Sequence, residues 1–155
     1  MNPVNTNNRK IIMATDTSTN DKITVDQAIT LSRNLREAAR LVANYLYGDN
    51  WKTLNSQSRE TLRSIEVTLQ NVAADIVTRG VGINLKNSSS SSSIADLSKA
   101  TNNAKKALKK INSVKQAISI VTSLIGLGAA IPTGNIEAII GAAKAVEEAA
   151  KPLLT

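Results

Sequence analysis

The sequence contains no cysteine and no histidine. Without thiols or imidazoles it can form no disulfide, no zinc site built from these ligands, and no catalytic site that needs a Cys nucleophile or a His base. Aromatic residues are also scarce, with one Trp, two Tyr and no Phe in 155 residues. A stacking surface for single-stranded nucleic acid is therefore hard to build.

The acidic residues form no arrangement that is typical of an active site. Glu147 and Glu148 are adjacent, so on a helix their side chains point about 100° apart and do not face a common substrate. The segment Gly126-Leu127-Gly128 is not followed by Lys-Ser or Lys-Thr, as a phosphate-binding loop would be. We therefore predict a protein that is not an enzyme and has no catalytic residue, cofactor site or metal site.

Apolar residues are plentiful, at 42% of the chain, and they recur at spacings of three and four residues, which indicates amphipathic helices. Thr24 and Gln27 have the spacing of a capping box at the start of the first helix. The second helix is predicted over 56–79. Because the connection between them is short, we predict an antiparallel hairpin over 24–80. The residues expected to be buried in it are Leu31, Leu35, Val42, Leu62, Ile65, Leu69, Val72 and Ile76.

The second half of the chain predicts a longer hairpin. No glycine or proline follows Ile94 until Gly126, which favours one continuous helix over 94–131, about 57 Å long, with Leu97, Leu108 and Ile111 buried. A shorter helix then begins at Ile136 and ends at Pro152. The predicted fold is all-α, a four-helix bundle of two antiparallel helical hairpins, 24–80 and 93–152, with a long third helix whose excess length would allow the second hairpin to project past the first.

The remaining segments are predicted to be flexible. Residues 1–23 are polar and are interpreted as an N-terminal tail, and 83–93, with six consecutive serines over 88–93, as a Ser-rich linker inside a single domain over 24–155. The apolar run Ile11–Ala14 is shorter than the 7–15 residues or so of a secretory leader. This favours a cytoplasmic protein or export by a leaderless route, and leaves open whether Met13 is the true start.

The formal net charge is +7, and its excess lies in residues 86–115, which hold seven lysines and one aspartate. The predicted basic face comprises Lys105, Lys106, Lys109, Lys110 and Lys115. It can be a solvated surface, a nucleic-acid site or a site for an anionic membrane surface. Because the block has neither arginine nor aromatic residues, the sequence does not favour nucleic acid as the partner.

Directly after this block, no charged residue occurs from Gln116 to Ile136. The predicted apolar membrane hairpin comprises Ile118, Val121, Leu124, Ile125, Leu127, Ile131, Ile136, Ile139 and Ile140. Residues 117–131 span about 22 Å, less than the ~30 Å hydrocarbon core, which argues against a resident membrane protein. Gly126 and Gly128 are expected to face Gly141 and Ala142 across the turn, because small residues let helices approach closely.

Two functions follow from this arrangement. The first is a non-enzymatic membrane-active helical bundle, toxin-like or cell-death-like, whose basic face meets an anionic membrane surface before the hairpin enters the bilayer and assembles as a pore. The alternative is a soluble helical protein–protein interaction module or oligomeric assembly subunit, whose partners are helices, including those of a second copy. Burial of Ile118, Val121, Ile125 and Ile140 by the first two helices would favour the alternative.

Overall fold

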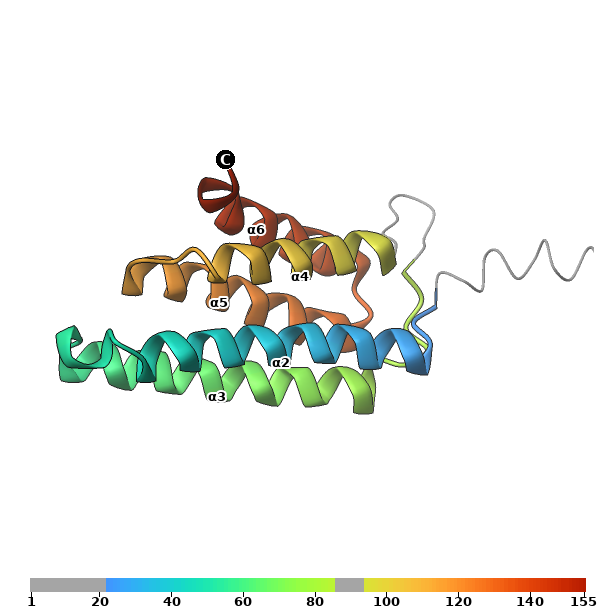
Figure 1. Ribbon diagram of the computed structural model, residues 1–155. Coiled ribbons are helices and arrows are strands. Elements are labelled where there is room, and N and C mark those ends of the chain that lie inside the picture. Colours follow the sequence, from blue (N-terminus) through green and yellow to red (C-terminus); the bar gives the residue numbers. More distant parts are fainter. Residues whose placement is uncertain (1–21, 86–93) are drawn as a thin grey trace, which may run out of the picture.

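The structure is a computed structural model that describes residues 22–85 and 94–155. Most of the predicted tail over 1–23 and of the predicted linker over 83–93 lies outside the described residues. The described chain forms five α helices and no β strand: α2 (Val25–Tyr47), α3 (Ser56–Arg79), α4 (Ile94–Leu108), α5 (Val114–Ala130) and α6 (Ile136–Leu154) (Figure 1). The all-α prediction is confirmed. Helix α6 continues two residues past its expected end at Pro152.

Helices α2 and α3 form the expected first hairpin, and its start is the predicted capping box. Thr24 Oγ1 accepts a hydrogen bond from Gln27 N at 3.1 Å, and Gln27 Oε1 accepts one from Thr24 N at 2.9 Å. At the same end of the hairpin, Ile23 N donates to Ile83 O at 2.9 Å and Gly82 N donates to Ile23 O at 2.6 Å. These backbone bonds fasten the residues before α2 to those after α3.

The opposite end of the hairpin is closed by aromatic and arginine side chains. The Tyr47 and Trp51 rings stack with centroids 5.4 Å apart, and Arg59 Cζ lies 4.0 Å from the centroid of the Trp51 ring. The Arg59 guanidinium also donates to the Trp51 carbonyl, and Arg63 Nε donates to the Tyr47 hydroxyl at 3.2 Å. Two of the three aromatic residues of the chain therefore stabilise this one turn.

The continuous third helix predicted over 94–131 is wrong. Helix α4 ends at Leu108 and α5 begins at Val114. Ser113 Oγ accepts from Gln116 N at 3.2 Å, while Gln116 Oε1 accepts from Asn112 N at 2.8 Å, so these side chains cap a new helix start. Helices α4 and α5 have 15 and 17 residues, so no described helix reaches ~57 Å. The second hairpin therefore has no excess length with which to project past the first.

Removing this cap should weaken the fold measurably. Ser113→Ala should lower the free energy of unfolding by about 1 kcal/mol, because the first turn of α5 loses the acceptor for one amide. Denaturant titration followed by circular dichroism measures the change. Ser119→Ala, at an exposed position of the same helix, should shift the value by less than about 0.5 kcal/mol. Equal losses in the two variants would contradict the capping role.

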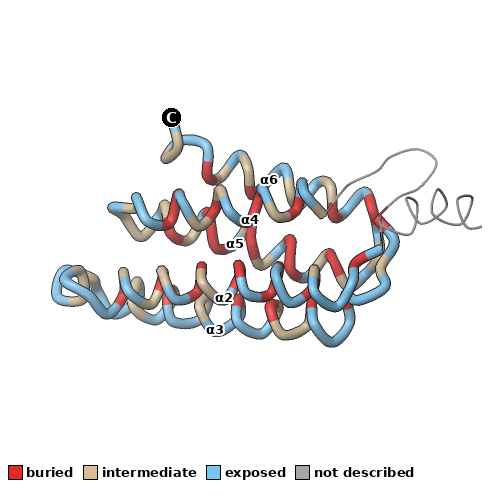
Figure 2. The backbone as a smooth tube through the Cα atoms, turned by 45° about the vertical axis from the view of Figure 1, so that its right-hand side comes forward, coloured by how far each residue is buried: buried red, intermediate tan, exposed pale blue. Residues whose placement is uncertain are grey.

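The five helices, rather than the expected four, surround one core. Each helix has two main neighbours. Helix α3 packs against α2 and α5, helix α6 packs against α5 and α4, and helix α4 also packs against α2. Helix α5 lies between the α2–α3 pair and the α4–α6 pair (Figure 1). Buried residues line the sides of the helices that face one another, while the outer sides of α2 and α3 are exposed (Figure 2).

Most of the predicted core residues are buried. Ile65, Val72 and Ile111 are half-buried instead and pack against the core from its edge. The position of Ile111 follows from the break between α4 and α5, which removes this residue from a helix. The other predicted core residues are fully enclosed, and they are Leu31, Leu35, Val42, Leu62, Leu69, Ile76, Leu97 and Leu108.

Candidate functional site

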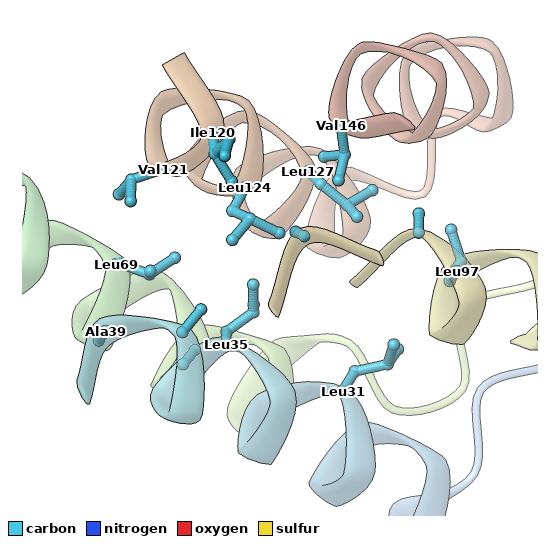
Figure 3. Close-up of a cluster of buried hydrophobic side chains, with 14 of the residues drawn as sticks. Leu31, Leu35, Ala39, Leu69, Leu97, Ile120, Val121, Leu124, Leu127 and Val146 are labelled. Atoms are coloured by element: carbon cyan, nitrogen blue, oxygen red, sulfur yellow. The ribbon is translucent and has the colours of Figure 1, made fainter. Parts of the chain in front are cut away.

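The large apolar side chains of the predicted membrane hairpin point mainly into the core. Figure 3 shows Leu124 of α5 directed toward Leu35 of α2 and Leu69 of α3. Three hairpin residues, Ile118, Ile125 and Ile140, are half-buried and pack against the core. The other six are buried, namely Val121, Leu124, Leu127, Ile131, Ile136 and Ile139. Of the four residues whose burial was expected to separate the two functions, Val121 is buried and Ile118, Ile125 and Ile140 are half-buried.

The turn that was expected to lead into a membrane is anchored to the bundle. Gly134 ends the short helix Ile131–Thr133 with φ 71°, a left-handed conformation that favours glycine. A Cβ atom there would lie 3.5 Å from Ile83 Cδ1, so the turn sits beside the segment that follows α3. Asn135 Oδ1 then accepts from Ala138 N at 3.1 Å and caps α6.

The glycines of α5 have two different surroundings, which corrects the expected packing against α6. A Cβ atom on Gly128 would lie 2.7 Å from Val72 Cγ2 and 3.4 Å from Leu35 Cδ1, so this glycine lets α5 approach α3 and α2. A Cβ on Gly126 or Gly141 would meet no atom within 4 Å. Gly126 and Gly128 differ because residues two positions apart in a helix point about 200° away from each other.

Beyond Lys115, the outer side of α5 carries no charge and is built from small residues. Exposed positions recur at spacings of three and four residues along the helix, and beside it the exposed residues of α6 include further small ones. We call this surface the small-residue face, and it comprises Ser119, Thr122, Gly126 and Ala129 of α5 with Ala138, Gly141 and Ala145 of α6. The uncharged stretch from Gln116 to Ile136 therefore has a buried apolar side and an exposed small-residue side.

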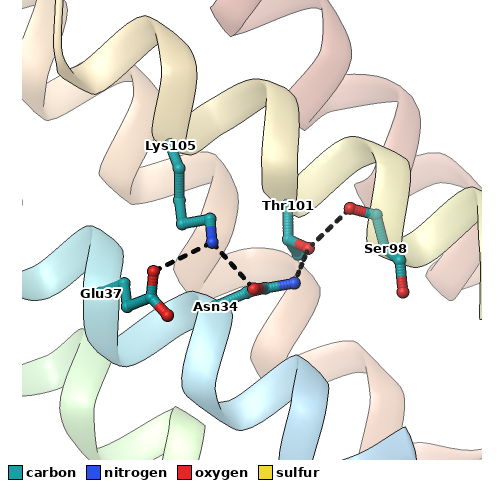
Figure 4. A network of polar contacts seen from close by, with 5 residues as sticks. All are labelled: Asn34, Glu37, Ser98, Thr101 and Lys105. Atoms are coloured by element: carbon teal, nitrogen blue, oxygen red, sulfur yellow. Dashed lines mark hydrogen bonds and ion pairs between the residues drawn. The ribbon is translucent and has the colours of Figure 1, made fainter.

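The five lysines of the predicted basic face do not share one environment. Lys105 turns toward α2, where its Nζ lies 3.1 Å from Glu37 Oε2 and 3.0 Å from Asn34 Oδ1, and its side chain is 18% exposed (Figure 4). The others remain exposed around the break between α4 and α5, and they are Lys106, Lys109, Lys110 and Lys115. Positive charge is favourable at the C-terminal end of α4, so three of them also have a structural explanation.

Lys105 belongs to a polar network that the sequence did not indicate. Asn34 is buried on α2, and its Nδ2 donates to Thr101 Oγ1 of α4 at 3.0 Å, while Thr101 Oγ1 donates to Ser98 O at 3.0 Å (Figure 4). The network joins the first hairpin to α4 and pairs both buried polar side chains. Such a network fixes the register of two helices, because any shift leaves Asn34 without partners.

The ion pair predicts a pH dependence of stability. The hydrogen bond and the charge of Lys105 lower the pKa of the Glu37 carboxyl below its ordinary value of 4.5. A lowered folded-state pKa contributes stability that is present above the unfolded pKa and lost as the pH falls through the folded one. Below about pH 4.5, we expect the denaturant midpoint of the wild type to decrease more steeply with falling pH than the midpoint of Glu37→Gln.

Denaturant titrations at a series of pH values measure this difference. The control is Glu60→Gln, which removes an exposed carboxylate on α3. Its denaturant midpoint should depend on pH almost as steeply as that of the wild type. A wild-type slope in the Glu37→Gln protein would contradict the role of the ion pair with Lys105.

Two further observations limit the chemistry of the site. Among the described residues, no three or more Asp and Glu side chains gather where they could hold a metal ion. In the same part of the chain, one helical segment, Val114–Thr133, is long and apolar enough to cross a membrane by length and composition, with a mean hydropathy of 1.6 and 39% of it buried. Core helices of soluble proteins have the same properties, so this is weak evidence for a membrane.

Comparisons with known proteins give the chain no family. No family model, no curated protein and no solved structure matches it.

Proposed function

We propose that this protein is a non-enzymatic helical assembly subunit whose small-residue face packs against the same face of a second copy. The observation that carries the proposal is the division of α5 into a buried side with large apolar residues and an exposed, uncharged side with small ones. The buried side stabilises the subunit itself, and the exposed side is free for a partner helix.

The exposed glycines support close contact between helices. Glycine in a helix interior costs about 1 kcal/mol relative to alanine, and within the described chain nothing approaches the Cβ positions of Gly126 and Gly141. The distance between packed helices depends on the side chains at their contact. A second helix can therefore approach α5 most closely at Gly126, which gives this otherwise unfavourable residue a use.

The distribution of charge allows a second copy to bind at this face. The formal net charge of +7 makes two copies repel one another at most orientations. On α5, no charged side chain follows Lys115, whereas on α6 the exposed Lys144 lies beside Gly141 and Ala145. Two α5 helices can therefore meet beyond Lys115 without opposing lysines. A two-fold contact would place the same surface of each subunit in the interface, as closed dimers require.

The test is the oligomeric state. Sedimentation velocity between about 1 μM and 1 mM should show concentration-dependent dimers of the wild type. Gly126→Arg should abolish them, because it places a long charged side chain at the point of closest approach. Ser64→Arg adds the same charge at an exposed position of α3 and should dimerise like the wild type. A wild type that stays monomeric throughout would refute the proposal.

Membrane activity is the second candidate, and the apolar segment Val114–Thr133 is the observation that favours it. Insertion would require Val121, Leu124 and Leu127 to leave the core, since each is fully buried. The exposed lysines near the break between α4 and α5 would attract an anionic surface, by about 1 kcal/mol each.

Dye release from liposomes separates the two candidates. Membrane activity predicts leakage that increases with anionic lipid and is abolished by Ile125→Asp, which costs about 2.5–3.5 kcal/mol at the centre of an inserted helix. Assembly without membrane activity predicts no leakage from any liposome, together with dimers in solution. Circular dichroism of Ile125→Asp checks that the helices persist.

A further inference from the structure

The exposed large apolar side chains all lie on the α2–α3 hairpin and its ends. Among the described residues they are Val25, Ile29 and Tyr47 of α2, Val67 and Val77 of α3, and Val81 just after α3. No comparable side chain is exposed on α4, α5 or α6. These side chains lie on different helices from the small-residue face, and where they gather they can form an interaction site.

Part of this surface lines an open groove between α2 and α3, which we call the arginine groove. Ile29, 40% exposed, and Val77, 36% exposed, face it from the two helices. Its volume is about 480 Å³, and its lining is completed by Ser32, Arg33, Arg36, Ala74 and Thr78. The groove therefore combines an apolar rim with two guanidinium groups.

The apolar strip continues from the groove toward the end of the hairpin. Val25 lies one helical turn before Ile29 on α2, on the same side of the helix. Val81 follows Val77 by four residues, and the hydrogen bonds of Ile23 to residues 82 and 83 hold this segment against the start of α2. Together these side chains offer apolar surface to the anchor residues of an amphipathic helix, which recur at single turns along that helix.

The two arginines of the groove form no ion pair with a carboxylate of the described chain, although the charge of Arg33 contributes to lowering the pKa of Glu37 one turn away on α2. Arg33 and Arg36 are exposed, and neither forms an ion pair with a described residue. Guanidinium groups bind carboxylates with two parallel hydrogen bonds, which makes Arg more selective for them than Lys. The polar part of the groove thus fits a partner with acidic side chains.

We propose that the arginine groove binds an acidic amphipathic helix of a different protein. Apolar side chains of that helix contact Ile29 and Val77, and its carboxylates pair with Arg33 and Arg36. A second copy of this chain fits poorly, because its net charge is +7 and a two-fold contact would oppose the same arginines. Nucleic acid fits poorly as well, since the rim is aliphatic and the groove has no aromatic ring on which a base can stack.

The experiment uses the full chain and labelled designed peptides. The probe is a helical peptide with Leu at successive turns and Glu beside them, and the controls are a scrambled peptide of the same composition and a version with Lys in place of Glu. Fluorescence anisotropy should show binding of the acidic amphipathic peptide only. Amide shifts in NMR spectra should change at Ile29, Arg36, Ala74 and Val77, and remain unchanged on α5.

Charge-matched variants test the arginines. Arg33→Glu with Arg36→Glu should weaken peptide binding by about tenfold or more. Lys52→Glu with Lys99→Glu makes the same change in net charge at exposed positions away from the groove, and should bind like the wild type. Ile29→Ser with Val77→Ser should also weaken binding, while circular dichroism shows that all variants stay folded.

Three results would overturn the proposal. The first is no binding of the acidic peptide, or equal binding of the scrambled one. The second is an equal loss in the two charge-reversal variants, which would indicate attraction by net charge alone. The third is binding of a single-stranded RNA that depends on Arg33 and Arg36 when the peptide does not bind. Each of these leaves the dimerisation test at Gly126 unaffected, because that test examines other helices.

Discussion

Leu124→Ala should lower the free energy of unfolding by about 2–5 kcal/mol, the cost of removing a fully buried leucine and leaving a cavity. Leu124 is 0% exposed and points from α5 toward Leu35 and Leu69 (Figure 3). Helix α5 lies between the two other helix pairs, so neighbours on several sides limit how far the cavity can close. Denaturant titration followed by circular dichroism measures the loss.

A matched control lies two residues away on the same helix. Thr122 is exposed on the small-residue face, and Thr122→Ala should change the free energy of unfolding by less than about 0.5 kcal/mol. If Leu124→Ala were as mild as Thr122→Ala, the buried side of α5 would be assigned wrongly. The contrast therefore tests the division of α5 on which the proposed assembly function rests.

The same contrast bears on membrane activity. A hairpin that enters a bilayer must first withdraw Leu124 and its buried neighbours from the core, which destabilises the rest of the bundle. A typical domain is stable by only about 5–15 kcal/mol, so releasing several such side chains would unfold much of the protein. Membrane insertion therefore predicts large-scale opening of the bundle, whereas assembly through the small-residue face requires none.

The sequence predicted the first hairpin well because local signals agree there. The capping box at Thr24, the apolar stripes and the short connection all indicate the same two helices, and their observed bounds match to within a residue or so. The cause of the later error was also local. Ser113 and Gln116 have the spacing of a helix start, but neither is the Gly or Pro that usually marks an interruption.

The environments within the second half could not be predicted from periodicity alone. Beyond Lys115, the exposed side of α5 is marked only by the small polar residues Ser119 and Thr122. The inward direction of Gly128 and the outward direction of Gly126 therefore become clear only from the packing against α3. In the same way, Asn34 resembles any surface asparagine until α4 brings Thr101 and Lys105 to it. The arginine groove also exists only because α2 and α3 pair.

The two glycines of α5 should respond in opposite directions to the same substitution. For Gly128→Ala, the new Cβ would lie 2.7 Å from Val72 Cγ2 and 3.0 Å from Val72 Cβ, and valine has little rotamer freedom to move away. Such overpacking costs about 1–3 kcal/mol, while alanine recovers at most about 1 kcal/mol of helix propensity. We expect a net loss of about 1–2 kcal/mol.

Gly126→Ala, by contrast, should stabilise the monomer by about 0.5–1 kcal/mol, because its Cβ enters open space and alanine favours the helix. Thermal or denaturant unfolding measures the change in free energy for both variants, at protein concentrations too low for dimers to form. Adding Val72→Ala should reduce the damage of Gly128→Ala, as coupled neighbours do, and leave the effect of Gly126→Ala unchanged. Losses of equal size in the two single variants would contradict the separate roles of the glycines. A Gly126→Ala protein that is more stable as a monomer yet dimerises less would show that this glycine serves contact between subunits.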